Sequence, residues 1–463
     1  MHPQTARPAV PGTMLNQRSF IVVALALLAL TGCKGFTTHG EREARHEVGT
    51  VKAAYRPNDQ RPALPNLTTN SSLGDFLTYA MLNQPQIEAA YYDWAASVEN
   101  ITVSRSLPDL QLTFQMYIQD VITSVMPGLM AQIPWLGKLR AQARAATAES
   151  QAKYFAFESA VLQTAYAVKQ GYYQLWFLDK KIAVDRGMLQ LLSELEQIAR
   201  AQNETGQATL QDVYRAQIEA DRLKTEIANL EDSRHSLDAQ FKAALGLTRD
   251  QPDPPLPVRF ESTTLDLSPE QILDTAFARN PQLKAMEAEV RQAQASLDLA
   301  RKSKLPDVTI GSSVDVKATP WLYWPQATVT LPIWRDKVAA EIAAAQAGKR
   351  AAQARLTAGQ INLTVEFAEK SYAYREVNRN LDLLREQLIP KAQRSLEIAR
   401  SGYLSGKTDF FNLIDAERSL LEFRLSEIDA RTQRELTLSE LSLLIAGVPS
   451  ANAPLLPAKQ VNH

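Results

Sequence analysis

The stretch KLRAQARAATAESQAKYFAF (residues 138–157) opens a run of good helix formers that continues without proline to Gln202. At about 1.5 Å of rise per residue, one helix over 138–202 would be roughly 100 Å long. Helices of globular proteins average about 10–14 residues, and most of their stability comes from packing against neighbours. The stretch therefore predicts a helix that lies in a bundle or helical barrel along its whole course. A second copy of this long helix is expected over 337–402.

An internal duplication relates the two long helices. Five segments recur in the same order at an offset of about 200 residues, as expected of a repeated structural unit. The matching pairs are NQPQIEAA and RNPQLKAM, SLPDLQLTF and KLPDVTIGS, QIPWLGK and TLPIWRDK, ETGQATLQDVYRAQ and LSGKTDFFNLIDAE, and Leu245–Gly246 and Ala446–Gly447. We predict a first repeat over 71–248, a proline-rich linker over 249–268, a second repeat over 269–447 and a tail over 448–463.

Each repeat is expected to hold a helix, a β-hairpin, the long helix and a return helix. The predicted first helices cover 73–105 and 269–302, with Ser72 and Ser268 as N-caps. Alternation with period two predicts strands, joined by turns in TSVMPG and ATPWLYW, over 109–122, 129–135, 307–317 and 326–333. Each return helix follows a glycine turn and ends at a glycine, at Gly206 and Gly246 in the first repeat and at Gly406 and Gly447 in the second. The first helix and the return helix together match the long helix in length, so we expect them to stack end to end beside it.

The N-terminus carries the features of an export signal. The apolar run FIVVALALLAL (residues 20–30) is shorter than the roughly 20 residues of a bilayer span, and LTGC follows it. This pattern predicts a signal peptide over 1–33 and resembles a bacterial lipobox, which would place a lipid on Cys33, the sole cysteine. An incidental small residue in a signal sequence is the alternative, and Met14 is an alternative start of translation. Residues 34–70 hold three prolines and no steady apolar period, so we expect an extended segment.

The predicted strands point to a membrane. Two hairpins supply four strands, whereas closed transmembrane barrels need about eight or more, and a bilayer cannot satisfy an open sheet edge. Strands of several copies must therefore close together. Aromatic residues gather at the strand ends, as in an interfacial girdle, at Trp135, Trp321, Tyr323, Trp324 and Trp334. A small soluble sheet covered by helices is the alternative.

Composition and motifs argue against several functions. A formal net charge of -1 over 463 residues gives no electrostatic case for binding nucleic acid. The sequence has no nucleotide-binding glycine loop, HExxH motif or nucleophile elbow, so we do not expect an enzyme. Its five histidines are scattered, and Met116, Met126 and Met130 are expected to pack in the strands rather than to bind a soft metal. We expect no metal site, and no cofactor other than the lipid on Cys33.

The lipobox, the duplicated unit and the tip sequence GYLSGKTDFFNLIDAE (residues 402–417) resemble the TolC-like outer membrane efflux factors, over about residues 71–447. The resemblance implies a mainly α fold with a membrane β-barrel portion, in which four strands per protomer complete a twelve-stranded barrel in a homotrimer. It also implies a long α-helical barrel in the periplasm. The implied function is the outer membrane channel of a tripartite efflux or secretion system, docked to a periplasmic adaptor and an inner-membrane pump. A lipid-anchored periplasmic coiled-coil adaptor or scaffold is the alternative, although it leaves the paired hairpins unexplained.

The resemblance also assigns roles at the helix–turn–helix tips. In relatives two acidic positions just after the second tip ring the aperture, and here the matching positions are Asn412, which departs from the pattern, and Asp415. A ring of carboxylates would hold cations and shape selectivity. Tyr403 and Lys407 at the second tip would bond to Asp212 at the first tip and hold the aperture shut. The alternative is that Asp212 and Asp415 only favour the helix dipole in early helical turns.

Contacts with the adaptor are expected on the two tip turns. The residues concerned are Gly206, Thr209, Leu210, Gly406, Phe410 and Phe411. The two phenylalanines are either exposed anchors for a partner helix or buried between adjacent helices, and the sequence leaves both open. QIPWLGKLRAQA (residues 132–143) resembles a segment of the heavy-metal-efflux branch, but antibiotics, metal ions and proteins all remain alternative cargoes.

Overall fold

The computed structural model describes residues 37–118, 122–135, 137–256, 260–262 and 269–449. The chain divides into two units, Met1–His39 and Gly40–His463, and the second carries the fold. The first repeat holds α3 (Leu73–Asn83), α4 (Pro85–Arg105), β1 (Gln111–Ile118), β2 (Ile122–Ile133), α5 (Lys138–Glu204) and α6 (Leu210–Ala244). The second holds α7 (Pro269–Arg279), α8 (Pro281–Lys302), β3 (Asp307–Asp315), β4 (Leu322–Thr330), α9 (Arg335–Leu383), η2 (Leu384–Leu388), α10 (Ile389–Leu404), α11 (Phe410–Ser439) and η3 (Glu440–Ile445). The duplication predicted from the sequence is confirmed.

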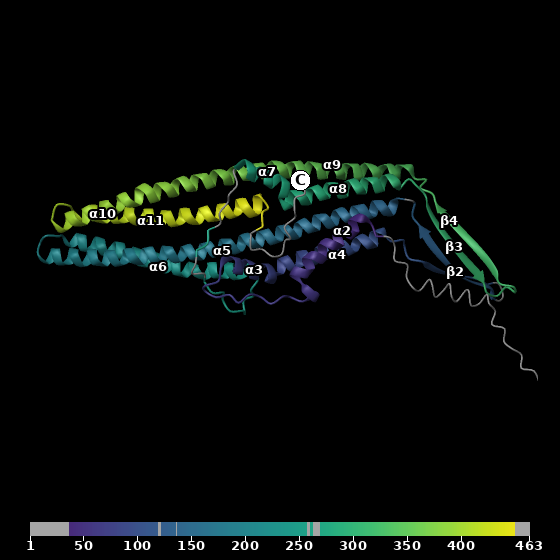
Figure 1. The fold of residues 1–463 in the computed structure, drawn as a ribbon, viewed down its shortest axis with the longest axis horizontal. Helices are drawn as coiled ribbons and strands as arrows, with labels where there is room; N and C mark the ends of the chain where they lie inside the picture. Colours follow the sequence, from purple (N-terminus) through teal and green to yellow (C-terminus); the bar gives the residue numbers. More distant parts are fainter. Residues whose placement is uncertain (1–36, 119–121, 136, 257–259, 263–268, 450–463) are drawn as a thin grey trace, which may run out of the picture. The chain divides into compact units, whose positions relative to one another are not determined.

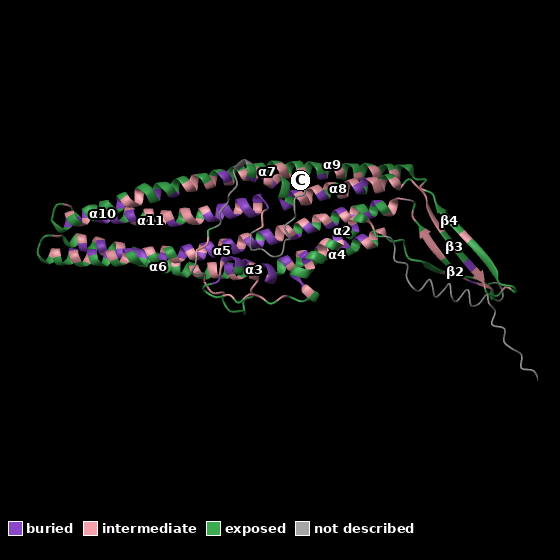
Figure 2. Cartoon of the chain, in the orientation of Figure 1, coloured by how far each residue is buried: buried purple, intermediate pink, exposed green. Residues whose placement is uncertain are grey.

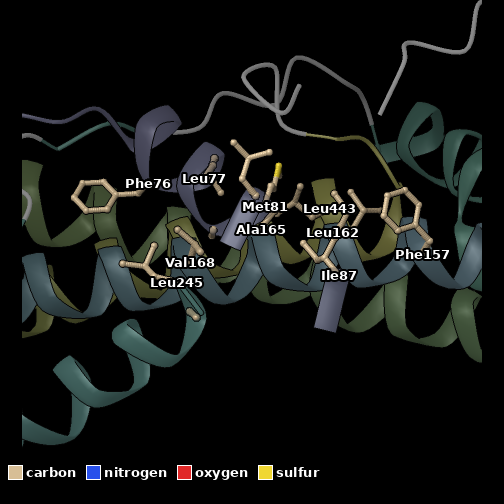
Figure 3. Packing of buried hydrophobic residues seen from close by; sticks show 14 of the residues in the cluster. Phe76, Leu77, Met81, Ile87, Phe157, Leu162, Ala165, Val168, Leu245 and Leu443 are labelled. Carbon is tan, nitrogen blue, oxygen red and sulfur yellow. The ribbon is translucent and has the colours of Figure 1, made fainter. Parts of the chain in front are cut away.

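α5 is the element on which the others pack. It runs for 67 residues, and α6 and α4 cover successive parts of it, while α8 and α11 of the second repeat also pack against it (Figure 1). Because neighbours lie on several sides, its buried residues form no single stripe: Gly171, Tyr172 and Tyr173 are buried in succession. The largest apolar cluster lies midway along α5 (Figure 3). It joins residues of α3, α4, α5 and η3, among them Phe76, Met81, Ile87, Phe157, Val168 and Leu443.

The end of the return helix contacts the break in the first helix in the same way in both repeats. We call this contact the joint. Proline disfavours the helical conformation in the residue before it, so the predicted first helices break at Gln84 and at Asn280. The amide of Asn83 donates to the carbonyls of Leu245 and Gly246, at 3.0 Å each, and Asn280 does the same for Leu444 and Ile445. The return helix thus meets the break and not the start of the first helix, which corrects the expected end-to-end stack.

Glycine is required at these joints. Gly246 and Gly447 have φ angles of +72° and +64°, in the left-handed region. A Cβ on Gly246 would lie 2.9 Å from the backbone oxygen of Asn83, and one on Gly447 would lie 3.0 Å from that of Arg279. The glycine therefore serves both to end the return helix and to admit the neighbouring backbone.

The second long helix departs from the expected continuous helix over 337–402. It is divided into α9 and α10 by the π-helical turn η2, and Pro390 follows at the start of α10. Proline has no N–H with which to continue the α-helical ladder, and a π-turn changes the hydrogen-bond register just before it. α9 is also the most exposed long helix, burying only Ala352, Leu363, Ser371 and Leu381 (Figure 2).

The four strands form one antiparallel sheet in the order β1-β2-β3-β4, in which β2 and β3 join the two repeats. The sequence predicted TSVMPG as a turn, but residues 123–128 lie within β2, paired with β1 and, at Gly128, with Ser313 of β3. Long-range pairing overrides the local turn signal of Pro127 and Gly128. ATPWLYW likewise contributes its last three residues to β4, and the β1–β2 turn falls on 119–121, outside the described residues. Among the described helices, none is long and apolar enough to span a bilayer.

The N-terminal segment is not extended, which corrects the expectation for 34–70. α2 (His39–Tyr55) and the short 3-10 helix η1 (Pro57–Asp59) occupy its centre, and Val51 and Tyr55 reach the main core. The prolines 57, 62 and 65 all follow α2, so they limit the helix without entering it. Residues 1–36, which include the predicted signal peptide, and 450–463 of the predicted tail lie outside the described residues, as does the predicted N-cap Ser268.

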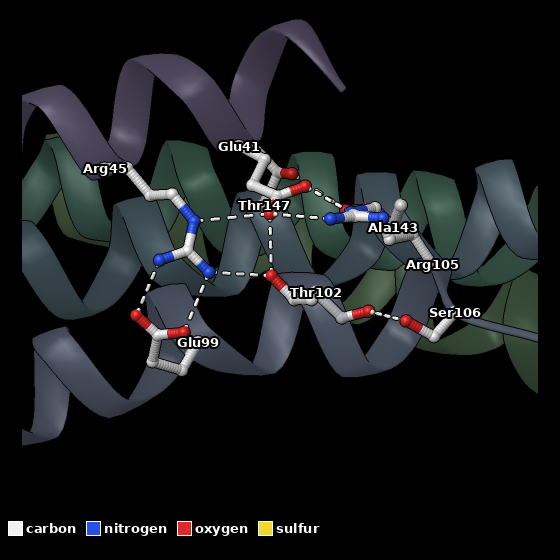
Figure 4. Close-up of polar contacts among 8 residues, drawn as sticks. All are labelled: Glu41, Arg45, Glu99, Thr102, Arg105, Ser106, Ala143 and Thr147. Carbon is white, nitrogen blue, oxygen red and sulfur yellow. Dashed lines mark hydrogen bonds and ion pairs between the residues drawn. The ribbon is translucent and has the colours of Figure 1, made fainter. Parts of the chain in front are cut away.

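A buried carboxylate fastens α2 to α4 (Figure 4). Glu41 is fully buried and accepts hydrogen bonds from Thr102, at 2.6 Å, from Arg105 and from Arg45. Arg45 also bonds to Glu99 at 2.6 Å, which closes the network across the two helices. Burial opposes ionisation, but the bonds from Arg105, Thr102 and Arg45 outweigh it and lower the pKa of Glu41 from 4.5 to about 2. The group is therefore a carboxylate at neutral pH.

We expect Glu41→Gln to release α2 from α4, because Arg105 and Arg45 would lose a buried anionic partner. Breaking such a pair costs a few kcal/mol, so a loss of about 2 kcal/mol is expected. Hydrogen exchange over 39–55 measures this as a roughly 30-fold fall in protection. The neighbouring exposed side chain, in Arg42→Gln, is the control and should leave protection unchanged. Equal protection in both variants would show that the network does not hold α2.

Candidate functional site

The predicted site lies in two helix–turn–helix tips, one between α5 and α6 and one between α10 and α11 (Figure 1). The turns have the same backbone design. Gly206 and Gly406 have φ angles of +73° and +69°, and the N–H groups that follow bond back to the carbonyls of Gln202 and Gly402. Both glycines face open space, so the backbone conformation and not crowding selects glycine. Residues 204–207 and 404–407 of the two turns are exposed.

The hydrogen bonds of Asp212 lie within the first tip. Its carboxylate accepts from the backbone N–H of Thr209 at 3.0 Å and from the Thr209 hydroxyl at 2.8 Å, in a capping box at the start of α6. Arg215 lies 3.9 Å from the same carboxylate. The alternative prediction for Asp212 was a role confined to the first turns of its own helix, and these bonds are of that local kind. In the second tip Asp409 caps α11 through the N–H of Asn412.

Among the described residues, the bonds of the predicted tip lock are not formed within one chain. Tyr403 is 6% exposed, and burial together with the nearby Asp212 raises its pKa to about 12. Its hydroxyl has no hydrogen-bond partner among the described residues, so no bond joins Tyr403 to Asp212 in this conformation. Lys407 is exposed on the turn. A lock through these three residues in the assembled channel stays a prediction.

The two phenylalanines of the second tip differ in burial. Phe410 is 1% exposed and its ring lies 5.2 Å from the ring of Tyr403, which corrects the reading of this residue as an exposed anchor. Phe411 is 56% exposed, and the guanidinium of Arg215 lies 5.8 Å from its ring centre. Of the other predicted contact residues, Gly206, Thr209, Leu210 and Gly406 are all exposed. Of the two phenylalanines, Phe411 is thus the one that is exposed on this tip.

Asn412 and Asp415, the predicted aperture residues, share one face of α11. Both are exposed and line a groove of about 510 Å³ between α10 and α11, together with Lys391, Ser395 and Thr408. Three residues apart on a helix, they lie side by side, as two rings stacked along a pore would require. Cys33, the predicted lipid site, lies outside the described residues. No cluster of His, Cys, Asp or Glu that could hold a metal occurs among the described residues.

Two buried carboxyl groups in the half of the helical bundle that carries the tips were not predicted from the sequence. Glu417 on α11 and Asp185 on α5 are almost completely buried, and none of their carboxylate oxygens has a hydrogen-bond partner within the described part of the chain. Burial raises the pKa of Glu417 to about 8 and that of Asp185 to about 6. A signal for Glu417 was present: it continues the apolar positions Phe410, Leu413 and Ile414 at helical spacing, so it falls on the buried stripe of α11.

A tandem repeat of helices with paired tips at one end and a four-stranded sheet at the other defines a class of channel-forming export proteins. The chain belongs to the outer membrane efflux protein family, which it matches over residues 77–247 and 272–447. Family membership assigns it to the outer membrane, as the resemblance implied.

Individual relatives are distant. The chain is 23% identical over 272 residues to the cobalt-zinc-cadmium resistance protein CzcC of Cupriavidus metallidurans, and the match covers 56% of this chain and 62% of that protein. It is 23% identical over 334 residues to the probable outer membrane lipoprotein SilC of Salmonella typhimurium, covering 69% and 70%. The crystal structure of the outer membrane protein VceC from Vibrio cholerae is similar with a TM-score of 0.70 at 17% identity, over 82% of this chain and 97% of that one. The structural likeness confirms the fold.

Phe410 and Phe411 provide a matched pair for testing the tip. Phe410→Ala should cost roughly 3–4 kcal/mol of local stability, because it leaves a cavity beside Tyr403. Phe411→Ala should change it by less than about 0.5 kcal/mol. Hydrogen exchange over 399–416 measures both. Equal losses in the two variants would contradict the assignment of one ring to the core and the other to the surface.

Proposed function

We propose that the protein is the outer membrane exit duct of a tripartite efflux system, a homotrimer that carries cargo passively across the periplasm and the outer membrane. The observation that supports this most directly is the sheet. β1 and β4 are its outer strands, and the outward-facing residues Leu112, Phe114, Met116 and Ile118 of β1 are exposed. A bilayer accepts such strands only in a closed barrel, and four strands from each of three copies would give twelve.

The helices fit a duct better than an adaptor. α9 exposes apolar residues along its length, including Ile361, Val365 and Tyr372, as expected of a helix that packs against another copy. Aromatic residues at the strand ends, Trp321, Tyr323, Trp324 and Trp334, are all exposed, where an interfacial girdle would place them. A lipid on Cys33 would anchor the trimer, and the tip turns would meet the periplasmic adaptor and inner-membrane pump. A lipid-anchored scaffold gives no role to the sheet, and no enzymatic role is proposed.

In this proposal the inner-membrane pump, and not the duct, selects the cargo. CzcC is named for resistance to cobalt, zinc and cadmium, and the segment over 132–143 resembles the heavy-metal-efflux branch, so divalent metal ions are the first cargo to test. Deleting the gene in its native host should then lower tolerance to such ions. Unchanged metal tolerance with lowered tolerance to antibiotics would assign the duct to a drug pump.

The duct itself is tested with the purified full-length protein. We expect trimers that are resistant to detergent and dissociate on heating, and discrete conductance steps when they are added to planar lipid bilayers. Monomers without conductance would exclude the duct and favour the scaffold.

Asp415→Ala should weaken block of the open channel by a trivalent cation such as a lanthanide. A unit charge about 4 Å away in water contributes about 1 kcal/mol even to a monovalent cation, so losing three carboxylates should raise the blocking concentration of a trivalent cation by roughly 100-fold or more. Asn412→Asp should lower it. Asp93→Ala, which removes an exposed carboxylate of α4 far from the tips, is the control and should leave block unchanged. Block that is unchanged in Asp415→Ala would exclude this residue from the aperture.

A further inference from the structure

A cavity of about 220 Å³ lies between α5, α6 and α11, close to both tips. It is lined by Leu192, Glu219, Arg222, Leu223, Glu226, Ile414, Glu417, Arg418 and Leu421. The aliphatic side chains come from all three helices, and the charged groups come from α6 and α11. We call this space the hairpin cavity, because its walls belong to both tip hairpins.

Glu417 is the residue of the hairpin cavity that lacks a partner. Its side chain is 3% exposed, and neither carboxylate oxygen has a hydrogen bond within the described part of the chain. The neighbouring cations serve another group: Arg418 is bonded to Glu219, and Arg222 lies 3.7 Å from the same carboxylate. A buried polar group without a partner has lost its hydrogen bonds to water without replacement, so a ligand that bonds to Glu417 would recover that lost free energy.

The charges of the cavity wall specify the charge of that ligand. α6 contributes Glu219, Arg222 and Glu226, α11 contributes Arg418, and the only lining residue of α5 is the apolar Leu192. Two arginines balance two glutamates, which leaves the ionised form of Glu417 as the one uncompensated charge. A single positive charge on the ligand would neutralise it.

The side chains that line the hairpin cavity also indicate the chemical class and the size of the ligand. Hard divalent cations take about six to eight oxygen ligands, and only the two oxygens of Glu417 are buried and unused at this site. Leu192, Leu223, Ile414 and Leu421 offer hydrocarbon contact instead. An apolar cavity of about 150 Å³ holds a benzene molecule. About 220 Å³ therefore accommodates a ring or short alkyl body with an ammonium group on a short arm.

We propose that the hairpin cavity binds a small amphiphilic organic monoammonium ion, with its ammonium group on the carboxylate of Glu417 and its hydrocarbon body against the leucines and Ile414. Such a ligand contacts α11 of the second repeat together with α5 and α6 of the first. Its binding would hold the two tip hairpins together. The proposal concerns the folded chain and does not depend on which cargo passes the duct.

The test uses 2-phenylethylammonium as the probe and the full-length protein in detergent, with binding followed by calorimetry. Wild type and Glu422→Gln, which changes an exposed carboxylate of the same helix, should bind alike. Glu417→Gln should bind at least tenfold more weakly. Leu223→Phe, which keeps the carboxylate and fills the cavity, should also bind at least tenfold more weakly. The uncharged analogue 2-phenylethanol should bind at least tenfold more weakly than the amine.

The pH dependence of binding distinguishes a role of Glu417 from a loss of binding caused by misfolding of a variant. Burial and the charge of Glu219 raise the pKa of Glu417 to about 8, so the ammonium ion must displace a proton below that pH. Affinity should rise by up to tenfold per pH unit from pH 6 to 8, and proton release should appear as a dependence of the binding enthalpy on the buffer. Equal binding by Glu417→Gln, equal binding of 2-phenylethanol, or an affinity independent of pH would each overturn the proposal.

Discussion

A helix of 67 residues must be covered along its whole length, and this requirement organises the chain. Neither α4, with 21 residues, nor α6, with 35, covers α5 alone, so the two must follow one another along it. The C-terminal carbonyls of α6 would then be left without partners where it meets the next element. The amide of Gln84 donates to two of them, those of Ala243 and Ala244, while Asn83 bonds to Leu245 and Gly246 just beyond the helix. Gly246 allows the close approach. The same solution at Asn280 and Gly447 shows that the joint was duplicated together with the helices.

Much of this arrangement can be predicted from local signals. The long helix over 138–202 has no proline and ends within two residues of its predicted end, and the glycines of the turns and joints mark positions of positive φ. Ser72 caps α3 in a capping box, as its position before an apolar run indicates. These features depend on a few neighbouring residues, which is why one sequence suffices to find them.

The features that the sequence did not predict depend on contacts between distant segments. Pro127 and Gly128 read as a turn, yet pairing with β1 and β3 keeps them in a strand. α2 has a polar sequence, and its first turns dock through Glu41, whose partners Thr102 and Arg105 lie about sixty residues away. At the tips, the burial of Phe410 and the exposure of Phe411 follow from which helix faces α11, and the sequence alone left both open.

The contacts between the two repeats change in kind along α11. Midway along this helix, Lys181 of α5 pairs with Asp429. Further toward the strands, Glu440 accepts a hydrogen bond from the hydroxyl of Tyr166 and forms an ion pair with Lys370. This position lies beside the apolar cluster of α3, α4 and α5. Nearer the tips, Arg418 of α11 pairs with Glu219 of α6, and the adjacent Glu417 is a buried acid with unused hydrogen-bonding capacity. Desolvating the carboxyl group of Glu417 opposes the contact of α11 with α5 and α6, whereas the apolar cluster formed by α5, α6, α10 and α11 stabilises it.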